Sequence, residues 1–179
     1  MNKLSIFFFV FFGHIAFSQT TSSDSLFQEL LDANHMEFTA PNSYKEIDCI
    51  ENRQMNYERA YKHPKEKFEV RYAIRSHDLE IAPSVFQATV MNISGEQLPK
   101  RHHYPMNPEA VQKELGADYG ATVMVEVGEE FGQDYVYCLL VFIHKKGIGD
   151  AYIFYLADDP ALIPELMRPI FHSLNFKQK

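Results

Sequence analysis

Alternating hydrophobic and polar positions mark the strands that this chain predicts. In the segment 57–62, Tyr57, Arg59 and Tyr61 alternate with Glu58, Ala60 and Lys62. After a turn at His63–Pro64, the segment 68–75 alternates in the same way. The pattern predicts an antiparallel hairpin with one apolar face, shared by Tyr57, Tyr61 and Tyr72, and one face in water. Short strands are also predicted at 36–41 and 174–176.

Two stretches nearer the C-terminus are apolar on both sides of the predicted strand. Residues 135–144 and 151–156 contain almost no charged side chain, and the segment 145–150 between them contains two glycines. A strand that is apolar on both faces is covered on both faces. We therefore expect these two strands, joined by a hairpin, at the centre of a sheet, with 120–127 as a looser neighbour.

Helical spacing appears between the strands. Leu26, Phe27, Leu30 and Leu31 form one stripe, and Phe86, Val90 and Ile93 form another, with Ser84 as the expected cap and Gly95 as the stop. The segment 107–116 has an asparagine cap, a proline at the first helical position and a closing glycine. A helix interrupted by proline is predicted after Asp159. The sequence predicts an α/β fold of the α+β type, a mostly antiparallel sheet with helices on both faces.

The first eighteen residues have the organisation of a secretory signal. Lys3 precedes an apolar run at 6–12, and Ala16–Phe17–Ser18 provides small residues where a signal peptidase cleaves. The run is too short to span a bilayer, which takes about 20 apolar residues. We expect a signal peptide at 1–18, an N-terminal lead with a short helix at 19–35 and a single α/β domain at 36–179. The protein is then exported, periplasmic or extracellular, with no membrane insertion after signal removal.

Charge and cysteine content restrict the function further. The net charge is −7 at neutral pH and no basic block is present, which argues against nucleic acid as a partner. The two cysteines are Cys49 and Cys138. An exported protein can oxidise such a pair, but Cys138 lies within an apolar strand, where a free buried thiol is common. The sequence leaves both outcomes open.

The candidate chemistry centres on Arg101–His102–His103–Tyr104–Pro105. Adjacent side chains of an extended segment point in opposite directions, so His102 and His103 do not readily bind one metal ion, and a zinc site needs further ligands. A solvated loop is the simpler interpretation. Tyr104 and Tyr119 flank the helix at 107–116 and offer the apolar area and hydroxyl groups of a recognition surface. We predict binding roles for His102, His103, Tyr104 and Tyr119, and no catalytic or metal-binding residue.

Both ends of the predicted domain resemble the PsbP-like superfamily, the fold of the photosystem II extrinsic subunit and of small bacterial exported proteins. Residues 36–44, MEFTAPNSY, resemble its opening strand, which closes with a proline and then an aromatic residue, and 170–176, IFHSLNF, is similar to its final helix and strand. Tyr44 stands where the family usually has tryptophan, and Asn34 and His35 stand where it usually has glycine. The resemblance implies a binding or assembly module without shared catalytic residues.

The sequence thus predicts an exported, non-enzymatic binding or assembly module that needs no cofactor. Its partner is an unknown protein or small molecule. The alternative is a metal-dependent hydrolase that uses His102 or His103.

Overall fold

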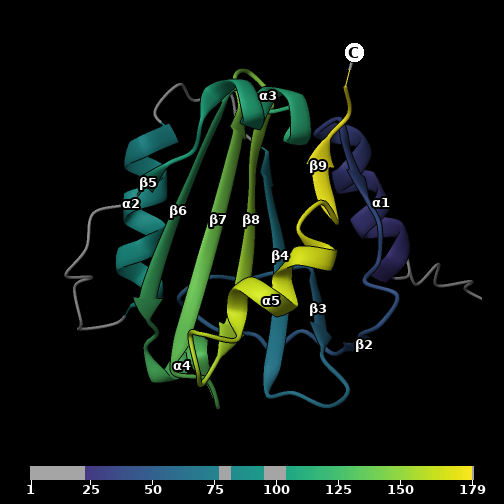
Figure 1. Ribbon diagram of the computed structural model, residues 1–179. Helices are drawn as coiled ribbons and strands as arrows, with labels where there is room; N and C mark the ends of the chain where they lie inside the picture. The colour runs from purple at the N-terminus through teal and green to yellow at the C-terminus, as the bar shows by residue number, and fades with distance from the viewer. Residues whose placement is uncertain (1–22, 77–81, 95–103, 179) are drawn as a thin grey trace, which may run out of the picture.

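The computed structural model describes residues 23–76, 82–94 and 104–178 of the chain (Figure 1). The signal predicted at 1–18, the stop at Gly95 and the two adjacent histidines, His102 and His103, lie outside the described residues. In the part that is described, no helix has both the length and the apolar character needed to cross a membrane.

A seven-stranded sheet, antiparallel in every pairing, forms the centre of the structure. From one edge to the other it consists of β2 (Lys45–Ile47), β3 (Arg59–Lys62), β4 (Phe68–Ser76), β8 (Gly149–Ala157), β7 (Tyr137–Lys145), β6 (Tyr119–Glu126) and β5 (Tyr104–Pro105). The predicted hairpin β7–β8 lies in the interior of this order, with Leu140 opposite Phe154. The two strands that are apolar on both faces are therefore central strands, as their composition predicts.

Two layers cover the two faces of this sheet and confirm the predicted fold class. The first contains α1 (Ser23–Ala33), α3 (Pro108–Leu115), α5 (Ile163–Met167) with the 3₁₀ turn Arg168–Ile170, and the separate antiparallel pair β1 (Met36–Phe38) and β9 (Leu174–Phe176). The second contains α2 (Ala82–Ile93) and α4 (Glu129–Gly132). Figure 1 shows α5 crossing in front of the sheet, β9 next to α1, and α2 beside β6.

Local signals predicted most helices well. The side chain of Asn107 accepts a hydrogen bond from the Ala110 amide, and Gly116 ends α3 in the left-handed conformation at φ 63°. The predicted cap of α2 is wrong, because the helix begins at Ala82 and Ser84 lies inside it. Proline fits the first turn of a helix, so Pro83 belongs to the helix instead of preceding it.

The predicted hairpin forms as β3 and β4, with Tyr61 opposite Val70. The face that was predicted to lie in water is instead covered by protein. Every residue of β4 from 68 to 74 is buried, including Glu69 and Arg71. The prediction failed because α4 and the neighbouring chain cover the face that the charged residues occupy.

The prediction that Tyr57, Tyr61 and Tyr72 share one apolar face is also wrong. Tyr61 and Tyr72 pack in the first layer, whereas Tyr57 packs in the second layer against Phe131. Strand β3 begins only at Arg59, so the strand alternation does not extend back to Tyr57.

Candidate binding pocket

The two predicted binding tyrosines that the structure describes differ in their surroundings. Tyr104 lies on the edge strand β5 and is 62% exposed. Tyr119 begins β6, is half-buried and packs with its ring 6.2 Å from that of Phe142. Tyr104 pairs with Thr122, three residues beyond Tyr119, so the two tyrosines occupy neighbouring strands out of register. Their binding role stays a prediction, as does that of His102 and His103.

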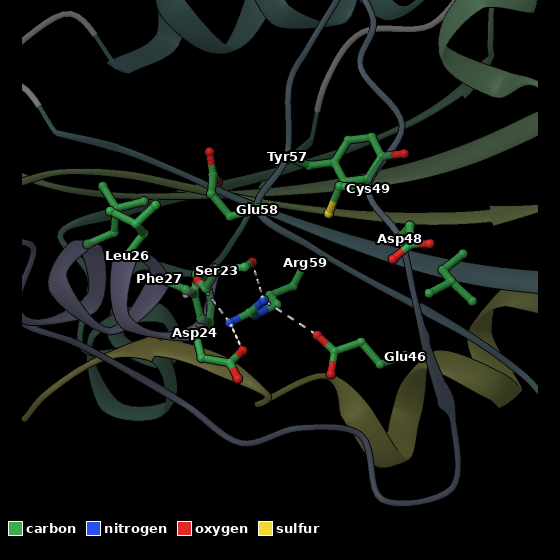
Figure 2. A pocket seen from close by; sticks show the side chains of 12 residues that line it. Ser23, Asp24, Leu26, Phe27, Glu46, Asp48, Cys49, Tyr57, Glu58 and Arg59 are labelled. Carbon is green, nitrogen blue, oxygen red and sulfur yellow. Dashed lines mark hydrogen bonds and ion pairs between the residues drawn. The ribbon is translucent and has the colours of Figure 1, made fainter. Parts of the chain in front are cut away.

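The structure contains a pocket of about 680 Å³ at the opposite edge of the sheet (Figure 2). Three segments that are separate in sequence form its wall: the first turns of α1, the end of β2 with the residues after it, and the entry to β3. The lining residues are Ser23, Asp24, Leu26, Phe27, Leu30, Glu46, Ile47, Asp48, Cys49, Tyr57, Glu58 and Arg59.

Helix α1 contributes one face to this pocket. Ser23, Leu26, Phe27 and Leu30 are spaced by three and four residues, which places them on the same side of a helix. Phe27 is buried against Phe38 of β1, with ring centroids 5.2 Å apart, and this contact fixes the helix against the paired strands β1 and β9. Leu26 remains 51% exposed and gives the pocket an accessible apolar wall.

Arg59 joins the helix to the sheet at the base of the pocket. Its guanidinium donates to Ser23 Oγ at 3.0 Å and to Asp24 Oδ1 at 2.6 Å, and lies 3.5 Å from Glu46 Oε1 (Figure 2). The same group lies 4.6 Å from the centre of the Phe27 ring, a cation–π distance. Arg59 is only 8% exposed, so its charge is compensated within the protein.

The loop between β2 and β3 is folded by its own hydrogen bonds. Asn52 Oδ1 accepts from the amides of Gln54 and Met55 at 3.1 and 2.7 Å. The amide of Ile50 donates to the hydroxyl of Tyr57 at 3.1 Å, which closes the loop beside the pocket. Because the donors and acceptors of these bonds all belong to the loop and to Tyr57, the protein itself fixes this wall of the pocket.

Glu58 is held in place on the same side. Its carboxylate accepts from the Ile74 amide at 2.9 Å and from Arg75 Nη1 at 2.7 Å. Asp48, by contrast, is exposed and forms no hydrogen bond or ion pair with the residues that the structure describes. The pocket therefore combines fixed carboxylates with one that is available to a ligand.

Cys49 places a thiol on the pocket wall, and both cysteines are free in this structure. Cys138 is buried in β7, whereas Cys49 is exposed. Desolvation around the sulfur, together with the nearby carboxylates of Glu58 and Glu46, raises the pKa of Cys49 to about 11, although Arg59 opposes this shift. At neutral pH the group is a thiol and a poor nucleophile.

Cys49 is expected to react with iodoacetamide about tenfold more slowly at pH 8 than an ordinary exposed cysteine. A pKa near 11 instead of 9 lowers the thiolate fraction about 100-fold, and the greater nucleophilicity of a more basic thiolate recovers about tenfold. The reference is Gln28→Cys in a Cys49→Ser background, an exposed position of α1 that does not line the pocket. Peptide mass spectrometry measures both rates, and equal rates would contradict the shifted pKa.

A second polar cluster lies in the core and is separate from the pocket. His144 Nδ1 lies 2.7 Å from Asp150 Oδ1, and the Tyr152 hydroxyl donates to Asp150 Oδ2 at 3.1 Å. All three are buried on the face that α2 covers. Within the described ranges no three histidine, cysteine or acidic residues are grouped so that they could hold a metal ion.

Comparison with known proteins leaves the pocket as the guide to function. No family model, no curated protein and no solved structure matches this chain.

Proposed function

We propose that the protein is an exported, non-enzymatic binding module and that its ligand site is the pocket between α1, the end of β2 and the start of β3. The observation that carries the proposal is the preformed pocket itself. Its volume of about 680 Å³ lies in the range of roughly 300–1,000 Å³ that ligand sites occupy, and it combines apolar walls with a few fixed polar groups.

The chemistry of the lining supports binding over catalysis. The donors of Arg59 are engaged by Ser23, Asp24 and Glu46, and the carboxylate of Glu58 is engaged by Ile74 and Arg75. The thiol of Cys49 is protonated at neutral pH, and its pKa of about 11 moves it further from the thiolate that a nucleophile requires. Groups whose hydrogen bonds are already satisfied shape a site and fix the orientation of a ligand, whereas catalysis needs an activated base or nucleophile.

Two further parts of the proposal rest on the sequence. Export rests on the organisation of residues 1–18 as a secretory signal. The PsbP-like relationship rests on the segments 36–44 and 170–176, and the adjacent pairing of β1 with β9 supports treating them as one structural unit.

Occupancy of the pocket in the protein's own compartment is the direct test. A cell-permeant maleimide is expected to label Cys49 at least threefold more slowly in intact source cells than in purified, dialysed protein at the same pH, because a bound ligand covers the thiol. The Gln28→Cys, Cys49→Ser variant, whose exposed thiol lies off the pocket, corrects for reagent access. If the corrected rates agree in cells and after purification, the pocket is empty in its compartment and the proposed function is wrong.

A further inference from the structure

The charged side chains around the pocket indicate whether its ligand is positively or negatively charged. Its lining contributes four carboxylates, from Asp24, Glu46, Asp48 and Glu58, which outnumber the guanidinium of Arg59 and that of Arg75, the partner of Glu58. An arginine in a pocket can indicate an anionic ligand, but this one already donates to Ser23 and Asp24 and lies beside Glu46. The excess of negative charge therefore repels anions and attracts cations.

The pocket also exposes apolar surface. The described residues include five large exposed hydrophobic side chains, and two of them, Leu26 and Ile50, lie in or directly beside the segments that line the pocket. Leu26 lines the pocket, and Ile50 directly follows the lining residue Cys49. Each is 51% exposed. A complementary ligand brings apolar groups as well as positive charge, because covering these side chains removes their surface from water.

The adjoining strand favours an extended peptide over a small amine. Strand β2 ends the order of the sheet, so no other strand in the described ranges pairs with the backbone groups on its outer side. An edge of this kind accepts an extended segment through main-chain hydrogen bonds, with side-chain pockets beside it for specificity. Glu46 and Ile47 of β2 also line the pocket, so strand edge and pocket are continuous.

We propose that the occupant of this pocket is an extended segment of a partner protein in which lysine or arginine alternates with large apolar residues. This rests on the proposed function, because it names the ligand class of the same site. Apolar side chains contact Leu26 and Ile50, and a basic side chain pairs with Asp48, the carboxylate that forms no bond or ion pair with the described residues. Arg59 keeps its structural partners throughout.

The probe for this proposal is an acetylated and amidated hexapeptide of alternating leucine and lysine, added to the purified mature protein. It is expected to slow maleimide labelling of Cys49 at least threefold, and 0.5 M salt is expected to weaken the effect because screening shortens the reach of the carboxylates. The same peptide with glutamate in place of lysine is expected to leave the rate unchanged. Hexylamine, a small apolar cation, is expected to give little protection.

Two matched pairs of variants separate charge from apolar contact. Asp48→Lys is expected to raise the peptide concentration for half-protection about tenfold, whereas Glu165→Lys, an exposed position outside the pocket, leaves it within about twofold. Leu26→Gln is expected to raise it about threefold to tenfold, and Met91→Gln, equally exposed on α2, to leave it unchanged. Each half-protection concentration is measured against the labelling rate of the same variant without peptide. The effect of the Asp48 substitution on the reactivity of the neighbouring Cys49 therefore cancels.

Each contrary outcome has a separate meaning. Equal protection by the glutamate peptide would overturn the charge argument, and equal protection by hexylamine would replace the peptide with a small cation. Absence of protection by the lysine peptide would overturn the ligand class even if Cys49 is still shielded in cells, so the binding function would stand. If Cys49 is labelled as fast in cells as in the purified protein, both the binding function and the ligand class are wrong.

Discussion

Replacing Arg71 with methionine is expected to lower the free energy of unfolding by about 3–5 kcal/mol, because it leaves the buried carboxylate of Glu69 without its partner. Arg71 has no exposed surface, and its Nε donates to Glu69 Oε1 at 2.5 Å. Its guanidinium also donates to the carbonyl oxygen of Phe131 and lies over two aromatic rings, 4.9 Å from the centre of that of Tyr57 and 5.0 Å from that of Phe131. One side chain thus attaches α4 to the central sheet.

Chemical denaturation of matched variants separates this pair from an ordinary surface pair. Lys67→Met removes the exposed partner of Asp158, 2.7 Å away, and is expected to cost less than about 1 kcal/mol. The double variant Arg71→Met, Glu69→Leu removes both buried charges and is expected to regain a large part of the lost stability. A single variant that costs under about 1 kcal/mol, or a double variant no better than the single one, would show that the pair is not buried as described.

Truncating Phe142 to alanine is expected to destabilise the protein by about 3–5 kcal/mol through the cavity that it leaves. Phe142 lies in β7 with no exposed surface, and its ring centroid is 5.3 Å from that of Phe86 on α2 and 5.0 Å from that of Tyr152 on β8. The residue therefore joins two strands to the covering helix, and few neighbouring groups can move to fill its volume.

The control for this prediction is Val136→Ala, next to β7 but 47% exposed, for which the expected cost is within about 0.5 kcal/mol. Urea titration followed by circular dichroism measures both variants. A cost under about 1 kcal/mol for Phe142→Ala would mean that α2 does not cover this face, which would contradict the two-layer arrangement.

The parts of the fold that sequence predicts well are those with a local signal. The apolar composition of 135–144 and 151–156 places β7 and β8 in the interior because no charged side chain there needs water. Asn107, Pro108 and Gly116 specify both ends of α3 through backbone hydrogen bonds and permitted dihedral angles. Neither inference depends on segments that are distant in the chain.

Burial of the charged side of β4 could not be predicted in the same way. Glu69 and Arg71 are two residues apart, as on the solvent-facing side of any half-buried strand. What buries them is α4 at 129–132, some sixty residues later, and no local pattern specifies that contact. The pair itself was the available signal, since opposite charges at this spacing can neutralise one another once they are covered.

The candidate pocket was missed for a related reason. Its walls come from 23–30, 46–49 and 57–59, whereas the predicted binding residues that the structure describes, Tyr104 and Tyr119, lie on β5 and β6 toward the opposite edge of the sheet. One signal was present: Arg59 shares a strand face with Tyr61, where a buried charged residue needs a partner of opposite charge. That partner, Asp24, lies on a helix that the sequence analysis assigned to the N-terminal lead.

Pairing of β1 with β9 has a consequence for how the chain reaches this structure. Met36 pairs with Phe176, so the only strand partner of β1 in the described chain follows it by more than a hundred residues. Closing so long a loop is slow compared with forming the neighbouring hairpins β3–β4 and β7–β8. Strand β1 therefore remains unpaired while the central hairpins form, and we expect folding to proceed from the central sheet outward to the paired strands β1 and β9.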